Sequence, residues 1–315
     1  MRRDRGAGEK GDAVKRRGFK AVLLGITLGL AMYLAPVSTT QASASPIVVQ
    51  DARGTLQTFA AVPRRIVSLL PSLTESVCVL GGCERLVGTD RYSNWPSSVI
   101  RLPKLGGIED ANLERIVALK PDVVLAAPST RVVERLEALG LKVVLLESKT
   151  HAEVRRTLNV LAALLGTPGA SAPLWNTIQR QVERAAEGVP VALRGQHVYF
   201  EVDATPYAAG EGSFIGETLT RLGLANTVPA VLGPFPQLNP EFVVRAQPDI
   251  VMAAQREIDQ MPRRPGWSQL NALRDHRVCG FSNERFEVLV RPGPRLGEAA
   301  QLLADCLIAL GTTTR

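Results

Sequence analysis

The chain has 315 residues, of which 45% are hydrophobic and 21% charged. This composition fits one large or two ordinary globular domains and excludes a disordered or collagen-like chain. The net charge of +7 is concentrated at the start, because residues 1–20 contain eight Lys or Arg against three acids. The remainder is nearly neutral, so composition gives no reason to expect a nucleic-acid partner.

An uncharged apolar run at residues 21–35 follows the basic segment, and small residues continue to Ala44. This order predicts a secretory signal peptide over residues 1–44, cleaved near Ala44. The run is shorter than the roughly 20 residues of a spanning helix, which disfavours the alternative of a membrane anchor. Arg16-Arg17 leaves a twin-arginine route open beside the general secretory route. Because no cysteine lies near the cleavage site, we expect a soluble periplasmic product rather than a lipoprotein.

The four cysteines suit an oxidising compartment. They fall into two sequence-local pairs, Cys78/Cys83 and Cys279/Cys306, although four cysteines allow three connectivities. We expect one or two disulfide bonds, with four reduced thiols as the alternative. Neither pair has metal-binding spacing and the three histidines are isolated, so no metal site is expected.

The segment 112–126 recurs 127 residues later as 239–253, with seven identities in fifteen positions. Each copy opens with an asparagine, Asn112 or Asn239, that suits a helix cap. The helix should end before Pro121 or Pro248, because the residue before proline avoids the helical region. A continuous apolar run follows, as in a strand buried on both faces of a parallel sheet. The repeat predicts two similar α/β lobes.

The remaining elements follow from the same patterns. Strands are predicted at 63–69, 86–88, 123–126 and 143–146 in the first lobe, and at 198–202, 250–253 and 278–281 in the second. Helices are predicted from a Ser72–Glu75 capping box to Gly81, at 152–165, from near Ser213, from Asn239, and from near Pro294 to Gly311.

Between the lobes, Leu174, Ile178, Val182 and Ala186 recur every four residues. This spacing predicts one amphipathic helix over 170–188, about 27 Å long. The expected organisation is a signal peptide at 1–44, an N-terminal lobe at 45–169, a linking helix at 170–188 and a C-terminal lobe at 189–315. The fold class is α/β, with two similar parallel-sheet lobes bridged by one long helix and a ligand cleft between them.

With these elements in this order, the chain resembles the helical-backbone (class III) periplasmic binding proteins that serve ABC importers of vitamin B12, haem and iron–siderophores. The resemblance covers residues 46–311 and rests on the order and spacing of several short motifs. These motifs are Pro63-x-Arg65-Ile66-Val67-Ser68-Leu69, Leu86-Val87-Gly88, Asn112-Leu113-Glu114-Arg115-Ile116, Lys120-Pro121-Asp122-Val123-Val124 and Arg291-Pro292-Gly293-Pro294-Arg295.

Within that family the segment 89–96 looks most like the vitamin B12 branch, which implies a corrinoid ligand between the lobes, at the carboxyl ends of the sheets. A corrinoid is a large, flat, mostly apolar disc fringed with amides, so aromatic faces and a few polar groups suit it. One departure is Ile108, which stands where the closest B12 binders carry tryptophan. Haem or an iron–siderophore is therefore the alternative ligand, and Arg91, Arg285 and Arg291 would suit an anionic chelate.

The resemblance also implies a set of ligand contacts, of which the five aromatic residues are expected in loops after strands or before helices. They are Tyr92, Trp95, Tyr207, Phe235, Phe286, Glu287 and Arg291. Loop packing is the alternative for the aromatic residues, and a structural salt bridge is the alternative for Glu287 and Arg291. We assign Trp175 and Trp267 to packing.

Glu114 and Glu241 occupy matching positions in the two repeat copies. A carboxylate in the first turn favours a helix through its dipole. The resemblance further implies that both glutamates dock onto arginines of a two-fold symmetric permease.

An enzyme is not expected. Residues 210–216 have neither dinucleotide-binding nor hydrolase spacing, and no histidine has a local nucleophile partner. We therefore expect a monomeric periplasmic protein, without a cofactor, that binds a corrinoid such as vitamin B12 and delivers it to an inner-membrane ABC permease with its ATPase. A corrinoid- or metal-handling enzyme is the second alternative.

Overall fold

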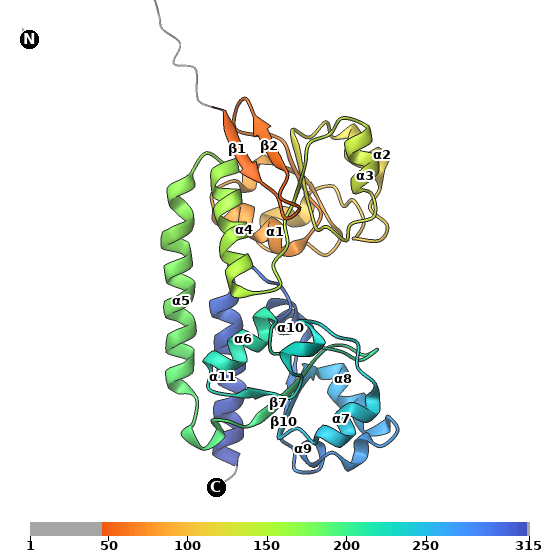
Figure 1. The fold of residues 1–315 in the computed structure, drawn as a ribbon, viewed down its shortest axis with the longest axis vertical. Helices are drawn as coiled ribbons and strands as arrows, with labels where there is room; N and C mark the ends of the chain where they lie inside the picture. The colour runs from red at the N-terminus through yellow and green to blue at the C-terminus, as the bar shows by residue number, and fades with distance from the viewer. Residues whose placement is uncertain (1–45, 314–315) are drawn as a thin grey trace, which may run out of the picture. The chain divides into compact units, whose positions relative to one another are not determined.

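The computed structural model describes residues 46–313, so the predicted signal peptide lies outside the described residues. Two separate parallel sheets are formed by different parts of the chain, and long helices pack beside them (Figure 1). No helix among residues 46–313 combines the length and apolar character needed to span a bilayer.

The first sheet contains four parallel strands in the order β4-β3-β5-β6. Their bounds are β3 Ile66–Ser68, β4 Leu86–Thr89, β5 Val123–Ala126 and β6 Val143–Leu145. The accompanying helices are α1 Pro71–Val79, α2 Leu113–Ala118, α3 Val133–Ala138 and α4 His151–Leu164. An antiparallel hairpin of β1 (Ile47–Gln50) and β2 (Leu56–Phe59), which the sequence patterns did not predict, precedes them.

The second sheet repeats this connectivity. Its strands are β7 His197–Asp203, β8 Tyr207–Ala208, β9 Ala225–Asn226, β10 Ile250–Ala254 and β11 Val278–Phe281. Its helices are α6 Phe214–Arg221, α7 Pro240–Ala246, α8 Gln255–Gln260, α9 Asn271–Arg274, α10 Asn283–Leu289 and α11 Leu296–Thr313. The parallel pairs β3–β4, β3–β5 and β5–β6 recur as β7–β9, β7–β10 and β10–β11, while β8 adds an antiparallel strand. The predicted pair of similar α/β lobes is confirmed.

The repeated segments form the same local structure twice. Asn112 Oδ1 accepts from the Arg115 amide at 2.9 Å, and Asn239 Oδ1 accepts from the Glu241 amide at 2.9 Å, so both asparagines cap their helices as predicted. Both helices end before the repeat proline, at Ala118 and Ala246, and the residue just before each proline is left-handed, Lys120 (φ 46°) and Gln247 (φ 44°). A left-handed residue therefore turns the chain out of each helix and into a strand that is buried along its whole length.

An aspartate after each repeat proline fastens the next strand to its neighbour. Asp122 Oδ2 accepts from the Arg64 and Arg65 amides at 2.8 and 2.9 Å. Asp249 Oδ2 accepts from the His197 amide at 2.8 Å. Each carboxylate thus satisfies backbone donors at the start of the adjacent strand, β3 or β7, which helps to fix its register.

The predicted linking helix is α5, Ser171–Gly188, but it does not act alone. It contacts α4, which follows the first sheet, as well as α6 and α11, which belong to the second part of the chain; α11 is its main partner (Figure 1). Ile178 and Val182 are buried in one hydrophobic cluster that continues through Leu303 and Leu307 of α11. The connection is therefore a layer of packed helices rather than a single rod.

The predicted capping box at Ser72–Glu75 is wrong. Helix α1 begins two residues earlier than such a box requires, at Pro71, with extended Leu70 as its N-cap and no side-chain cap. Proline fits the first turn because its missing N–H has no helical partner there. The polar side chains of Thr74 and Glu75 are buried and instead contact Ser93 and Arg291, respectively.

Both sequence-local cysteine pairs form disulfides. Cys78–Cys83 closes the turn after α1, and Cys279–Cys306 joins β11 to α11. No free cysteine remains among the described residues.

Candidate ligand-binding site

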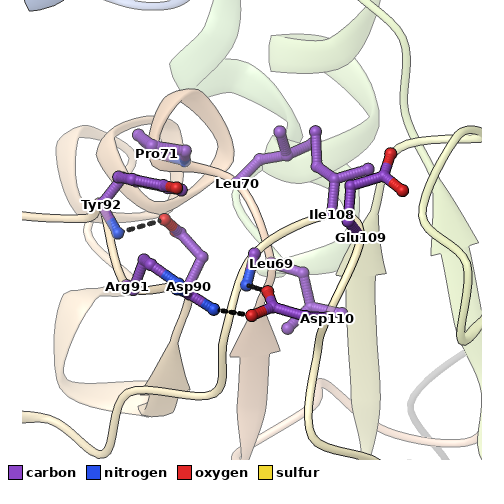
Figure 2. A pocket seen from close by; sticks show the side chains of 10 residues that line it. Leu69, Leu70, Pro71, Asp90, Arg91, Tyr92, Ile108, Glu109 and Asp110 are labelled. Carbon is purple, nitrogen blue, oxygen red and sulfur yellow. Dashed lines mark hydrogen bonds and ion pairs between the residues drawn. The ribbon is translucent and has the colours of Figure 1, made fainter.

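A pocket of about 380 Å³ opens at the carboxyl ends of β3 and β4 (Figure 2). Its lining residues come from three segments that lie next to one another in the fold. They are Leu69, Leu70, Pro71, Asp90, Arg91, Tyr92, Gly107, Ile108, Glu109 and Asp110. The pocket therefore lies at the end of a parallel sheet where open α/β folds generally bind ligands.

Asp90 orders the loop that carries Tyr92. Its Oδ1 accepts from the Tyr92 amide at 2.7 Å and from the Ser93 amide at 3.1 Å, and Ser93 Oγ donates to Oδ2. Burial raises the pKa of the Asp90 carboxyl, and these hydrogen bonds oppose that shift. The aspartate thus ties residues 90–93 into one turn.

Lys104 also hydrogen-bonds to this turn. Its Nζ donates to the Ser93 carbonyl at 2.6 Å and to Thr89 Oγ1 at 3.0 Å. Burial lowers the pKa of Lys104, while nearby Asp90 raises it. The turn is therefore hydrogen-bonded to its surroundings, while Tyr92 itself is 61% exposed.

Charged groups surround the mouth of the pocket. The Arg91 guanidinium pairs with Asp110, whose Oδ1 also accepts from the Gly107 amide at 2.8 Å. These two partners lower the pKa of the Asp110 carboxyl, the Gly107 hydrogen bond making the largest contribution. Glu109 pairs with Arg131. Arg91 is the one cation among the lining residues in the described part of the chain, and an acid already pairs with it.

The predicted contacts other than Tyr92 do not line this pocket. Trp95 is half-buried, with the Arg295 guanidinium 5.0 Å from its ring centroid. Phe235 is half-buried, with its ring centroid 5.8 Å from that of Phe214. Tyr207 is exposed. The structure thus leaves only Tyr92, from the predicted set, on the pocket wall.

The predicted loop positions were wrong for two residues of the set, Tyr207 and Phe286. Tyr207 lies in the short strand β8, whereas Phe286 and Glu287 lie on helix α10. Phe286 stacks on Phe200 of β7, with ring centroids 6.0 Å apart and planes 8° apart. Because one face of Phe286 packs against the sheet, its position on α10 serves the core of the second lobe.

Arg291 forms a structural salt bridge, which was the alternative to a direct ligand contact. Its side chain is 7% exposed and bonds to Glu75, Asn94, Glu287 and the Tyr92 carbonyl. The salt bridge is therefore present, and the guanidinium makes four protein contacts.

Glu114 and Glu241 lie in the first turns of α2 and α7. Both side chains are exposed, and neither carboxylate has a hydrogen-bond or ion-pair partner among the described residues. The repeat thus presents an unpaired acid on each lobe.

The two tryptophans assigned to packing do pack. Trp267 is fully buried in the second lobe, and its ring meets that of Tyr199 edge to face at 5.8 Å. Trp175 is half-buried on α5 and meets the His151 ring edge to face at 6.3 Å.

Sequence reasoning missed the acids of the pocket. Asp90 follows a buried strand and precedes Ser93, which is a pattern typical of an aspartate turn, so a local signal existed. The meeting of Arg91 with Asp110 had no such signal. It arises because the Arg91 amide donates to the Gly106 carbonyl at 2.8 Å and the Leu105 amide to the Thr89 carbonyl at 2.9 Å, which brings the two segments together.

Among residues 46–313 no group of three or more His, Cys, Asp or Glu side chains is arranged to hold a metal ion. The pocket consequently offers an aromatic ring, apolar walls and paired charges as its binding groups.

Two sheets of equal connectivity, joined through helices and carrying a pocket at the strand ends, define a two-lobed α/β binding protein. The family model described as periplasmic binding protein matches residues 66–284, and the chain belongs to this family. Its fold is that of the helical-backbone (class III) substrate-binding proteins of ABC importers. Members of this family are transport binding proteins, and membership implies a permease with its ATPase and a small-molecule ligand.

Three relatives illustrate the range of the family. The chain is 26% identical over 310 residues to an uncharacterized ABC transporter substrate-binding lipoprotein, YvrC, of Bacillus subtilis, covering 93% of this chain and 97% of that one. It is 29% identical over 248 residues to the vitamin B12-binding protein of Salmonella typhimurium, covering 77% and 90%. The solved haem-binding protein BhuT, in complex with two haems, has a TM-score of 0.66 at 25% identity, covering 78% and 98%.

Proposed function

We propose that this protein is exported to the periplasm and binds a corrinoid, such as vitamin B12, for delivery to an ABC permease. The observation that carries the ligand class is the charge of the pocket around Tyr92. Asp110 pairs with Arg91, and Glu109 adds a further acid at the mouth. Unpaired cations favour the binding of haem propionates and anionic siderophore chelates, whereas the neutral amides of a corrinoid do not need them.

The shape and chemistry of the wall support the same ligand. Tyr92 offers an exposed ring on a hydrogen-bonded turn, and Leu69, Leu70 and Ile108 add apolar surface. An aromatic face beside aliphatic side chains suits a large, mostly apolar macrocycle. The relationship to vitamin B12-binding proteins agrees with this proposal.

Haem is the second candidate, and one observation favours it. The phenol of Tyr92 lies at an exposed pocket wall, and a tyrosine oxygen is an axial ligand of haem iron in some proteins. A solved relative of the family also binds haem.

Titration of the purified protein with cyanocobalamin and, separately, with haemin tests the ligand class. We expect a Kd for cyanocobalamin below about 1 µM, equivalent to about −8 kcal/mol, and weaker binding of haemin. The substitution Y92A should weaken cyanocobalamin binding about tenfold or more, because an aromatic anchor at the pocket wall is lost. Tight haemin binding without cyanocobalamin binding would replace the corrinoid with haem.

Docking to the permease is proposed for Glu114 and Glu241. Both carboxylates are exposed and unpaired among the described residues, and a two-fold symmetric permease would present the same basic pocket to each. The double variant E114A/E241A should keep its affinity for cyanocobalamin and lose about tenfold in affinity for the permease.

The matched control for docking is E134A. Glu134 is exposed in the first turn of α3, so this variant removes a similar charge at a position outside the repeat. Permease affinity equal in E134A and E114A/E241A would reject the docking role.

A further inference from the structure

Arg291 joins the C-terminal part of the chain to the turn that carries Tyr92. Its Nη1 donates to Glu75 Oε1 at 2.9 Å and to Asn94 Oδ1 at 2.8 Å. Its Nη2 donates to the Tyr92 carbonyl at 3.0 Å and to Glu287 Oε2 at 2.8 Å. Three of these four partners lie about 200 positions earlier in the sequence, close to the start of the first lobe.

Glu75 holds the guanidinium in place. This carboxylate on α1 is 1% exposed, and its Oε1 accepts from Arg291 while Oε2 is buried without a hydrogen-bond partner among the described residues. A buried carboxylate with so few hydrogen bonds depends on the opposite charges beside it, here Arg291 and, 3.8 Å from the same oxygen, Arg295. Glu75 therefore restricts Arg291 to one orientation.

A closed ring of hydrogen bonds fixes the other end. Asn94 Nδ2 donates to Glu287 Oε2 at 2.7 Å, and the same oxygen accepts from Arg291. The planar fork of arginine can serve a carboxylate, an amide and a carbonyl at once, whereas a lysine ammonium can replace the charge but not this geometry.

The backbone of Tyr92 is thus held on both sides of its Cα. Its amide donates to Asp90 from within the first lobe, and its carbonyl accepts from Arg291 of the C-terminal part. Tyr92 is exposed and lines the pocket. A side chain presented from a fixed backbone loses less entropy when a ligand covers it.

We infer that Arg291 is a positioning residue, which fastens Tyr92 and Asn94 to the C-terminal part of the chain and so presents the Tyr92 ring to the ligand. This inference rests on the proposed function for its effect on affinity, and it gives Arg291 a role other than the expected direct ligand contact. Because Arg291 is not among the pocket-lining residues, its effect on binding is transmitted through the backbone of Tyr92.

A second buried ion pair provides the matched control. Arg264 Nη1 and Nη2 donate to the two Glu201 oxygens at 2.7 and 2.9 Å, and Glu201 is buried. This pair lies within the second lobe and has no hydrogen bond to residues 90–95. A substitution there disturbs a comparable salt bridge without touching the turn.

Hydrogen exchange of the ligand-free protein is the first test. We expect R291K, and the exposed-site variant N94A, to speed amide exchange in the peptide covering residues 90–95 by about tenfold, while R264K leaves that peptide unchanged. N94A removes an exposed side chain, so it stays informative if R291K fails to fold. Exchange at 90–95 that is unchanged in folded R291K or N94A would overturn the inference.

Binding of cyanocobalamin and of haemin is the second test. With whichever probe the wild type binds, R291K should weaken binding about tenfold, and this loss should shrink to less than twofold in a Y92A background. An equal loss in both backgrounds would mean that Arg291 acts independently of Tyr92 and would refute the positioning role. Binding of neither probe by the wild type would refute the proposed ligand, while the exchange experiment would still decide the inference.

Discussion

His151 of α4 and Thr218 of α6 share a hydrogen bond of 2.9 Å between Nε2 and Oγ1. The same nitrogen lies 3.1 Å from the Phe214 carbonyl, and the His151 amide donates to Glu217 at 2.6 Å. A neutral imidazole with its hydrogen on Nε2 satisfies both oxygens. One buried histidine thus connects a helix of the first lobe with a helix of the second.

This contact predicts a pH dependence of stability. Burial lowers the pKa of His151; Glu217 opposes the shift and Arg221 adds to it. The unfolded chain therefore binds the proton more readily, so His151 makes the protein lose stability as the pH falls through the unfolded value near 6.5. Urea unfolding at about pH 7.5 and about pH 5.5 should show a smaller loss for H151Q than for wild type.

The comparison must be between variants, because other groups titrate too. Burial raises the pKa of Glu75 and of Glu201, and each contributes stability that is lost as the pH rises. The control is H197Q, at an exposed histidine of the second lobe. If H197Q reduced the acid-induced loss as much as H151Q, burial of His151 would not be its cause.

The ion pair of Arg91 and Asp110 predicts a change in ligand preference. Replacing Asp110 by Asn keeps an acceptor for the Gly107 amide and removes the charge that neutralises Arg91. We expect D110N to bind haemin about three- to tenfold more tightly, with cyanocobalamin affinity changed less than twofold. Parallel titrations of the two ligands measure the ratio.

Glu109 offers a control with the same charge change in the same pocket. It pairs with Arg131, which does not line the pocket, so E109Q leaves Arg91 neutralised. Equal gains in haemin affinity for E109Q and D110N would mean that net charge, rather than the release of Arg91, determines the preference.

Replacing Ile108 by tryptophan should raise the affinity for a corrinoid. This half-buried residue lines the same pocket as Tyr92, and an indole there would add flat apolar surface for a macrocycle. We expect I108W to tighten cyanocobalamin binding about three- to tenfold, as additional buried apolar area allows. The aliphatic variant I108V should stay within about twofold of wild type, and weaker binding by I108W would argue against a disc-shaped ligand at this wall.

The sequence predicted the repeated part of the fold well because its signals are local. Asn112 and Asn239 cap helices through neighbours two or three residues away, and the strands that follow are continuously apolar. The short hairpin β1–β2 was missed, since four-residue strands that are mostly exposed give little periodic pattern. The capping box failed because Thr74 and Glu75 serve distant partners, which no local pattern encodes.

The sequence predicted only the part of the candidate site that can be identified from a single residue and its neighbours in sequence. Tyr92 was found because it follows a strand and matches a family motif. Arg291, which donates to the Tyr92 carbonyl, lies 199 positions away in sequence, and Glu75, which accepts from Arg291, lies 216 positions from that arginine. At Gly106, a Cβ atom would lie 2.5 Å from the Asp110 carbonyl, so the turn that brings Asp110 to Arg91 depends on a backbone approach. These residues meet because of the folded topology, and their spacing in the sequence does not reveal it.

The two disulfides predict unequal contributions to stability. Cys78–Cys83 closes a segment with a sequence separation of 5, whereas Cys279–Cys306 closes one of 27. In the chain-entropy model, cross-linking the longer segment restricts the unfolded chain more, by about 3.5 kcal/mol against about 2 kcal/mol. C279A/C306A should therefore lower the free energy of unfolding more than C78A/C83A.

Urea unfolding of the two double variants at neutral pH measures this difference. Cys279 is buried against α11, so replacing it also removes packing contacts and lowers the free energy of unfolding further. Reduction of the wild-type disulfides provides a check that leaves the side-chain volume unchanged. Each disulfide is reduced selectively while the other stays intact. If the two reductions destabilised the protein equally, chain entropy would not explain the contribution of either bond. A larger effect at Cys279–Cys306 would mean that fastening α11 to β11 is the stronger constraint, and α11 is the main helix partner of α5.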